Sequence, residues 1–303
     1  MLTREWKLVL TEDSGTSTVF YCDDGVEMNM ALDRVMAGDE VTTRCINGKG
    51  AMVNALSTMW HFMIGRKMRR VDPKYAMIRS AYQPRGIFAE DYYADFRDNY
   101  YNGRIALMDI LRKLSVSIHV YGYLTGRLWE YYGDKDNHFR IELPTGLKES
   151  EKLATPIAIA EVNRGKFSKK FVDRPELEVI LEEDLFGNGE YLAHEIIRQS
   201  IDIYEFCSTY AMSRGVIIAE AKFNFGIKDM GGDHRLELCG DVLTPDTARF
   251  WMKDQYSGEG PQSHYDAKYI EQFLSAHLEY IDPDLPLPIA VKDRYLKVCK
   301  KLL

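Results

Sequence analysis

The sequence predicts an α+β fold, because hairpin-like strand patterns and separate amphipathic helices both occur along the chain. Residues 5–23 and 214–240 each hold β-branched or aromatic runs around a Gly-containing turn, which is typical of antiparallel hairpins. Residues 190–214 carry apolar side chains at three- and four-residue spacing, as on an amphipathic helix. With 303 residues, the chain can bury a large core and divide into two lobes.

The other helices and strands are predicted from the same patterns, namely alternation for strands and three- or four-residue spacing for helices. The first hairpin turns at Asp13-Ser14-Gly15, and 47–65 is expected to be a helix with an apolar stripe that includes Leu56 and Trp60. Residues 104–123 alternate as strands do, and 72–85 has a mixed loop and strand character. Two closing helices are expected at 265–278 and 291–303.

Composition excludes several classes of protein. The net charge of −7 disfavours a general nucleic-acid binder, which is usually basic. The five cysteines show no CxxC spacing and favour a reduced, cytoplasmic location. No apolar run is long enough to span a membrane, the N-terminus lacks a signal-peptide core, and the histidines form no zinc motif. The expected partners are therefore small molecules, and a homo-oligomer stays open.

The hairpin from 214 to 240 carries the strongest chemical signal. Strand alternation puts Lys222 and Asn224 on one side and Phe223 and Phe225 on the other. Asp241 follows the second strand, so a cation and an acid are expected near one another. Such a pair suits a nucleotide with Mg²⁺.

Six segments resemble the SAICAR synthetase family. They are Glu220–Gly226, Gly240-Asp241, Thr244–Trp251, Asn47–Asn54, Val120–Trp129 and Leu143–Ser150. The resemblance implies an ATP-grasp-like, two-lobe architecture with a nucleotide site in the interlobe cleft. Residues 1–111 would form the nucleotide-covering lobe, and residues 112–303 would carry the substrate and metal site.

The resemblance also implies roles for particular residues, with ATP and Mg²⁺ as cofactors. The catalytic candidates are Lys222 and Asp246. The nucleotide candidates are Lys7, Met108, Ile110, Lys222 and Asp241, where 108–111 is the expected linker between lobes. The substrate candidates are Gly126, Arg127, Asp246 and Arg249. The metal candidates are Asp241, Asn224 and Glu220, of which Glu220 can share the face of Asn224.

Several positions depart from the family pattern. The nucleotide loop at 4–10 has no glycine and keeps only Lys7. Tyr121 and Arg127 stand where the family has Arg and Ser, and Asn224 stands where it has a metal-side Glu. The family's Pro-x-Glu is here 115–117, without the acid, and its Thr-Lys-Ala and Gly-x-His-Asp segments are missing from 158–170.

Plainer interpretations stay open at each candidate residue. Lys222 could form a structural ion pair, Asp241 could cap a turn and Asp246 could cap a helix. Arg249 could pair with a surface carboxylate, and Arg127 could either contact phosphate or fill a pocket.

The sequence favours a purine-pathway ligase that joins carboxyaminoimidazole ribotide to L-aspartate with ATP through an acyl phosphate. One alternative is a divergent homologue with another carboxylate or nucleotide substrate. The other is a non-catalytic, nucleotide-binding homologue. The departures from the family pattern favour these two over a simple copy of the enzyme.

Overall fold

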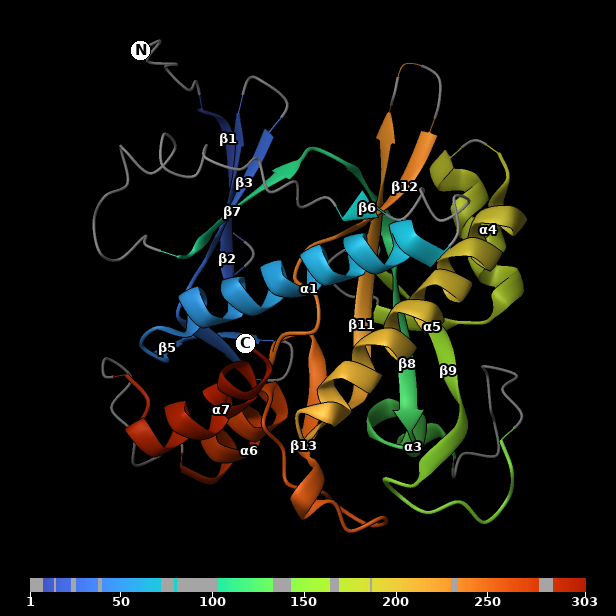
Figure 1. Ribbon diagram of the computed structural model, residues 1–303. Helices are drawn as coiled ribbons and strands as arrows, with labels where there is room; N and C mark the ends of the chain where they lie inside the picture. The colour runs from blue at the N-terminus through green and yellow to red at the C-terminus, as the bar shows by residue number, and fades with distance from the viewer. Residues whose placement is uncertain are drawn as a thin grey trace.

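The strands in the described part of the chain form two larger sheets and one small sheet. The computed structural model describes residues 8–13, 15–22, 26–37, 40–71, 79–80, 103–132, 143–163, 169–185, 187–229, 231, 234–277 and 286–303. Within these ranges, helices and antiparallel strand pairs occur together, which confirms the α+β class (Figure 1). No helix in the described part of the chain is long and apolar enough to cross a membrane.

The first sheet is built from the N-terminal part of the chain. Its strand order is β1-β2-β3-β7, with β1 at Leu8–Asp13, β2 at Ser17–Cys22, β3 at Val26–Ala31 and β7 at Ile105–Asp109. A separate pair, β4 (Arg34–Ala37) and β5 (Glu40–Cys45), follows β3. The predicted first hairpin is confirmed, and Gly15 has the positive φ of 90° that its turn requires.

The second sheet forms the centre of the molecule. Its order is β10-β9-β8-β11-β12-β6, and a further strand, β13, pairs with β11. The strands span Lys169–Val172 (β10), Lys152–Asn163 (β9), Arg112–Tyr123 (β8), Val216–Asp229 (β11), His234–Cys239 (β12), Arg79–Ser80 (β6) and Ala248–Met252 (β13). The predicted hairpin after residue 214 is confirmed as β11 and β12.

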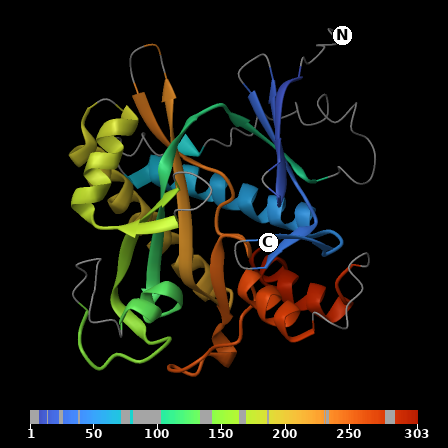
Figure 2. The same cartoon turned by 180° about the vertical axis from the view of Figure 1, so that it is seen from behind.

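Two long helices cover one face of this sheet, and a short helix lies on the other. Helices α1 (Lys49–Val71) and α5 (Gly189–Ser213) cross in front of the sheet in Figure 1. Seen from behind, α3 (Gly126–Tyr132) lies in front of the strands (Figure 2). Trp60 of α1 and Cys207 of α5 are fully buried in the main core with Phe223 of β11.

The remaining helices complete the larger part of the molecule. Helix α4 (Arg174–Leu185) precedes and packs on α5, while α6 (Ala267–His277) and α7 (Ile289–Leu302) lie together near β4 and α1. The helices predicted for 47–65, 190–214, 265–278 and 291–303 are all confirmed, with ends that differ by a few residues. Segment 72–85 lies outside the described residues except for β6.

Strand β11 is irregular at both ends of its central segment. Its register shifts between Ile218 and Glu220 against β13, and between Asn224 and Gly226 against β8. The segment from Glu220 to Asn224 pairs without interruption with β8 between these two irregularities. This is the segment that carries the candidate site.

Candidate active site

Polar side chains gather on the face of the second sheet that is turned away from α1 and α5. On β11, Lys222 lies opposite His119 of β8, and Asn224 lies opposite Ser117. Ser117 in turn lies opposite Glu161 of β9, so a single row crosses all these strands. Because side chains alternate along a strand, Phe223 and Phe225 point to the other face. Both phenylalanines are buried in the main core, which confirms the predicted two-sidedness of the strand.

Glu161 is the centre of this polar face. Its Oε2 accepts a hydrogen bond from Lys222 Nζ at 2.7 Å and lies 3.2 Å from His119 Nε2. Its Oε1 accepts from Arg127 Nη1 at 3.0 Å. The Glu161 side chain is only 3% exposed, so these contacts replace its hydration.

Glu220 joins the same network from β11. Its Oε1 lies 3.1 Å from His119 Nδ1, and its Oε2 lies 3.4 Å from Arg249 Nε. A Cβ atom added at Gly126 would lie 2.9 Å from Glu220 Oε2, and Gly126 has a φ of +57°. Only glycine therefore fits easily between the start of α3 and the Glu220–Arg249 pair.

The network sets the ionisation of both carboxyl groups. Burial by itself raises the pKa of Glu161, but His119 and Lys222 outweigh it and hold that pKa well below its usual range. Burial likewise opposes Glu220 ionisation, yet Arg249 and His119 lower the Glu220 pKa to about 2. Burial lowers the His119 pKa, and the two carboxylates more than offset this, so the net shift is upward. Both carboxyl groups are therefore ionised, and a protonated His119 can donate to each.

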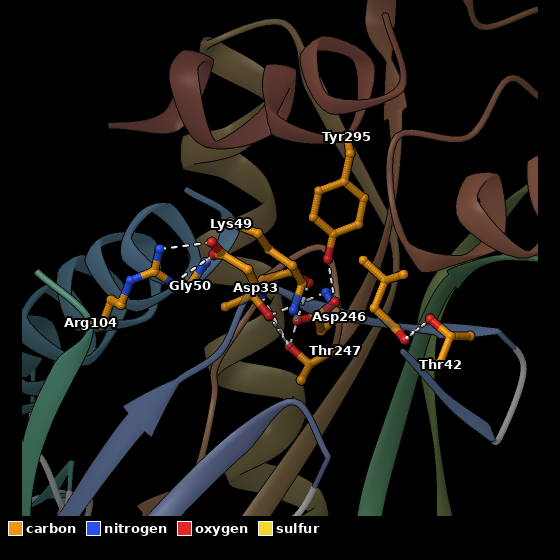
Figure 3. A network of polar contacts seen from close by, with 10 residues as sticks. Asp33, Thr42, Lys49, Gly50, Arg104, Asp246, Thr247 and Tyr295 are labelled. Atoms are coloured by element: carbon orange, nitrogen blue, oxygen red, sulfur yellow. Dashed lines mark hydrogen bonds and ion pairs between the residues drawn. The ribbon is translucent and has the colours of Figure 1, made fainter. Parts of the chain in front are cut away.

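A second polar cluster surrounds Asp246, on the turn before β13. Its Oδ2 lies 2.6 Å from Lys49 Nζ, and the Tyr295 hydroxyl of α7 donates to its Oδ1 (Figure 3). The Lys49 side chain is only 1% exposed. No helix begins at Asp246, so the helix-cap interpretation is wrong, because this carboxylate instead neutralises a buried lysine.

Asp241 belongs electrostatically to this second cluster. Burial raises its pKa to about 6, the charge of Asp246 adds to the rise, and Lys49 opposes it. The charged neighbours of Asp241 are thus Asp246 and Lys49, whereas Lys222 pairs with Glu161. The predicted proximity of Lys222 and Asp241 stays a prediction.

Asp33 fixes the start of α1, from which Lys49 projects. Its carboxylate accepts from the backbone N–H groups of Gly48 at 3.0 Å and Gly50 at 2.8 Å. The same carboxylate also accepts hydrogen bonds from both terminal nitrogens of Arg104, at 2.6 and 2.8 Å (Figure 3). This network connects β4, α1 and the segment before β7.

The backbone joins the two polar clusters. The N–H of Lys222 donates to the carbonyl oxygen of Thr247 at 3.0 Å, one residue after Asp246. A Cβ atom on Gly240, the residue before Asp241, would lie 3.5 Å from Asn224 Nδ2. The turn that carries Asp241 and Asp246 therefore adjoins the strand that carries Lys222 and Asn224.

The structure brings together most of the site residues predicted from the sequence. Gly126, Arg127, Glu220, Lys222 and Arg249 form one network, and Asn224 accepts a hydrogen bond from Ser117 Oγ at 2.6 Å. The ion pair considered for Lys222 is present, with Glu161 as its partner. Arg249 pairs with Glu220, which is largely buried, so the interpretation of Arg249 as the partner of a surface carboxylate is wrong.

The nucleotide candidates of the N-terminal part lie apart from these networks. Met108 is buried against Leu111 and Cys239, whereas Ile110 is 41% exposed, between the last strand of the first sheet and β8. Lys7 lies outside the described residues.

Sequence reasoning missed the partners of the predicted residues, namely His119, Glu161, Lys49 and Tyr295, and also the Asp33–Arg104 pair beside Lys49. A signal existed for His119 and Glu161, because each is a titratable residue with apolar neighbours on both sides (Ile118–Val120 and Ile157–Val162). Lys49 lies in the Asn47–Asn54 segment that resembles the family, but no role is assigned to it there. For Tyr295, in a helix with several basic residues, the sequence offers no comparable signal.

The fold has counterparts among solved structures. SAICAR synthase from Saccharomyces cerevisiae, complexed with SAICAR, matches with a TM-score of 0.78 at 23% identity over 97% of this chain and 94% of that one. A type-2 SAICAR synthetase in complex with ADP matches with a TM-score of 0.65 at 18% identity, over 97% of each chain. At these identities the likeness establishes the fold.

Sequence comparison establishes the family. The family model for SAICAR synthetase matches residues 15–286. A phosphoribosylaminoimidazole-succinocarboxamide synthase of Lachnospira eligens is 31% identical over 286 residues, which cover 92% of this chain and 90% of the relative. The enzyme of that name from Saccharomyces cerevisiae is 27% identical, over 86% of this chain and 81% of its own. The chain therefore belongs to the SAICAR synthetase family, a family of ligases that form a carbon–nitrogen bond.

Proposed function

We propose that this chain uses ATP to join the amine of L-aspartate to the carboxyl group of carboxyaminoimidazole ribotide, a step of purine biosynthesis. Family membership over most of the chain supports this reaction. The observation that carries it is the converging set of three basic side chains at one face of the sheet, Lys222 of β11, Arg249 of β13 and Arg127 of α3, which are held by Glu161 and Glu220. Every substrate of the reaction is anionic, so a fixed cationic face suits all of them.

The reaction forms one amide bond in two steps. The ribotide carboxylate first takes the γ-phosphoryl group of ATP, and ADP leaves. The aspartate nitrogen then attacks the acyl carbon; the C–N bond forms, the C–O bond to phosphate breaks, and the amine loses a proton. Such chemistry depends mainly on placement and on neutralising charge.

The residues of this chain divide these tasks. Lys222 and Arg249 lie on paired strands, so their positive charges are presented to phosphoryl and carboxylate oxygens without reorganisation. Asp246 is held by Lys49 and Tyr295, and each of its oxygens keeps a second lone pair with which to orient the attacking amine. Gly126 lets the start of α3 approach the Glu220–Arg249 pair and so closes the substrate side of the site.

The residues around Asp241 fit a magnesium site that the nucleotide completes. Within the described residues, no group of three or more acidic, histidine or cysteine side chains stands ready to hold a metal ion. Mg²⁺ is commonly held by one or two carboxylates together with substrate phosphates. Asp241 would supply the carboxylate, and Asn224 could add its Oδ1 through the lone pair that Ser117 Oγ does not use. Both oxygens of Glu220 already face His119 and Arg249. When bound, the ion would neutralise phosphate charge.

We propose further that the nucleotide lies where the two sheets meet. Residues 108–111 join β7 of the first sheet to β8 of the second, as expected of a linker between lobes 1–111 and 112–303. Helix α1 nevertheless packs into the core of the second sheet, so the N-terminal segment contributes to both parts. A cytoplasmic, reducing location fits the free thiols of Cys45, Cys207, Cys239 and Cys299.

A coupled assay of ADP release tests the proposed reaction. With ribotide, L-aspartate and Mg-ATP, turnover in the ordinary enzymatic range, about 1–10³ s⁻¹, is expected, together with formation of the succinocarboxamide product. Lys222→Met should abolish this turnover. Absence of turnover with these substrates, but ADP release with another carboxylate, would favour the divergent homologue instead.

A further inference from the structure

Glu161 is placed so that it controls the positions of two proposed catalytic cations at once. It lies on β9, one strand removed from Lys222, and its two oxygens face different groups. Oε2 holds Lys222 Nζ at 2.7 Å, and Oε1 holds Arg127 Nη1 at 3.0 Å. The three residues come from β9, β11 and α3, so one carboxylate links separate parts of the chain.

The surroundings prevent Glu161 from moving away from these partners. Phe171 of β10 lies directly opposite Glu161 in the sheet. The Arg127 guanidinium lies 5.1 Å from the centre of the Phe171 ring, and the His119 ring meets the same phenylalanine edge-on at 5.2 Å. An apolar floor and a neighbouring imidazole thus confine a carboxylate that is only 3% exposed.

Because both bind the same carboxylate, the Lys222 ammonium and the Arg127 guanidinium are held at a fixed distance from one another. Lys222 is 26% exposed and Arg127 is 38% exposed, so both can reach a ligand while their bases stay anchored. Without the carboxylate, the two positive charges would repel one another and adopt many rotamers. A shift of about 1 Å in such groups can cost roughly 10²-fold in rate.

We propose that Glu161 is a positioning residue, which fixes Lys222 relative to Arg127 for the reaction proposed above and so depends on that function for its kinetic test. It contacts no substrate in this role. Its effect passes through Lys222 and Arg127.

Three single variants test the role. Glu161→Gln keeps the shape and removes the charge, and Glu161→Asp withdraws the carboxylate by one methylene. Glu195→Gln is the control, because Glu195 also accepts hydrogen bonds from an arginine, Arg198, but lies on α5 on the other face of the sheet. Glu161→Gln should lower kcat/KM by about 10²-fold, mainly through kcat, and Glu161→Asp by less. Glu195→Gln should leave both constants unchanged.

A double-mutant cycle separates positioning from a general structural effect. Lys222→Arg retains the charge with a different reach. If Glu161 acts through Lys222, adding Glu161→Gln to Lys222→Arg should cost much less than it costs in the wild type. Losses that multiply, or wild-type kcat/KM in Glu161→Gln, would overturn the inference. If Glu161→Gln does not fold, Glu161→Asp decides, and an unchanged kcat/KM in that variant also overturns it.

A readout that needs no turnover keeps this inference apart from the proposed function. Lys222 should react slowly with acetic anhydride, since the contact of its Nζ with Glu161 Oε2 at 2.7 Å holds the amine against the sheet and limits the approach of the reagent. Glu161→Gln should raise acetylation of Lys222 several-fold, as followed by peptide mass spectrometry, while Glu195→Gln should not. Equal acetylation in all three proteins would contradict the positioning role even if the wild type is an active ligase. Absence of wild-type turnover, by contrast, counts only against the proposed reaction.

Discussion

At the scale of single residues, the site depends on carboxylates held in opposite electrostatic situations. Glu161 and Glu220 are surrounded by cations, which keep them ionised despite burial. Asp241 is half-buried beside another acid, Asp246, and its pKa rises to about 6. A bound cation would therefore stabilise the ionised form of Asp241 most, because it would offset the repulsion from Asp246.

We therefore expect Asp241→Asn to weaken Mg-ATP binding by at least about tenfold, because Mg²⁺ loses the carboxylate that is proposed to hold it. Asn224→Glu should strengthen the binding, since it adds a second carboxylate beside Gly240. Titration calorimetry with ATP, with and without Mg²⁺, measures both changes. Affinity for metal-free ATP serves as the control and should hardly change in Asp241→Asn. Unchanged Mg-ATP affinity in that variant would mean that Asp241 is not a metal ligand.

The sequence could predict Lys222 and Asn224 as site candidates, because a charge or amide in an apolar strand is conspicuous, and Arg249 because the segment Thr244–Trp251 resembles the family. It could not predict the partners, because pairing across β8, β9 and β11 joins residues such as Glu161 and Lys222 that are far apart in the chain. Glu161 and His119 become meaningful only when the register of three strands is known.

At the scale of elements, the helices and hairpins with strong periodicity were predictable, and the connecting strands were not. Strand β13 is only five residues long and pairs with the start of β11, so its contact is entirely non-local. Strand β9 is long, but its partner β8 precedes it by a helix and a loop. Local propensity carries little information about such pairings.

The start of α1 offers a prediction at this scale, because Asp33 connects it to Arg104 and β4. Arg104 and the Gly50 and Gly48 N–H groups outweigh burial and lower the Asp33 pKa. The ionised group therefore stabilises the fold above its unfolded pKa, and this contribution is lost as the pH falls through the lower folded value. Asp33→Asn should reduce the free energy of unfolding at pH 7 by about 3 kcal/mol, because it leaves Arg104 buried without its charge partner.

Thermal unfolding at several pH values measures this effect. The difference between Asp33→Asn and the wild type should shrink as the pH falls below 4. Asp202→Asn is a matched control on α5, where the Arg198–Asp202 pair is 30% and 35% exposed. It should cost less than about 1 kcal/mol. A pH-independent difference for Asp33→Asn would show that packing, and not ionisation, accounts for its effect.

At the scale of the whole molecule, the proposed nucleotide site uses both sheets, so a bound nucleotide should stabilise the protein as a unit. Mg-ATP at about 100 times its dissociation constant should raise the free energy of unfolding by roughly 2.7 kcal/mol. A thermal shift with Mg-ATP, compared with ATP plus a chelator, measures this effect. Lys222→Met should reduce the shift. No shift at millimolar Mg-ATP would contradict nucleotide binding by the folded chain.

The two irregularities of β11 have a consequence for how the chain reaches its native pairing. A slide of β11 by a single residue would bring Phe223 to the charged face and push Lys222 into the apolar core, an error that simple ladder hydrogen bonding would tolerate. The shifts at Ile218/Glu220 and Asn224/Gly226 interrupt the ladder on either side, so a displaced strand would meet mismatched neighbours at both ends. The segment between the two shifts, Glu220–Asn224, can therefore pair with its neighbouring strands in one register only.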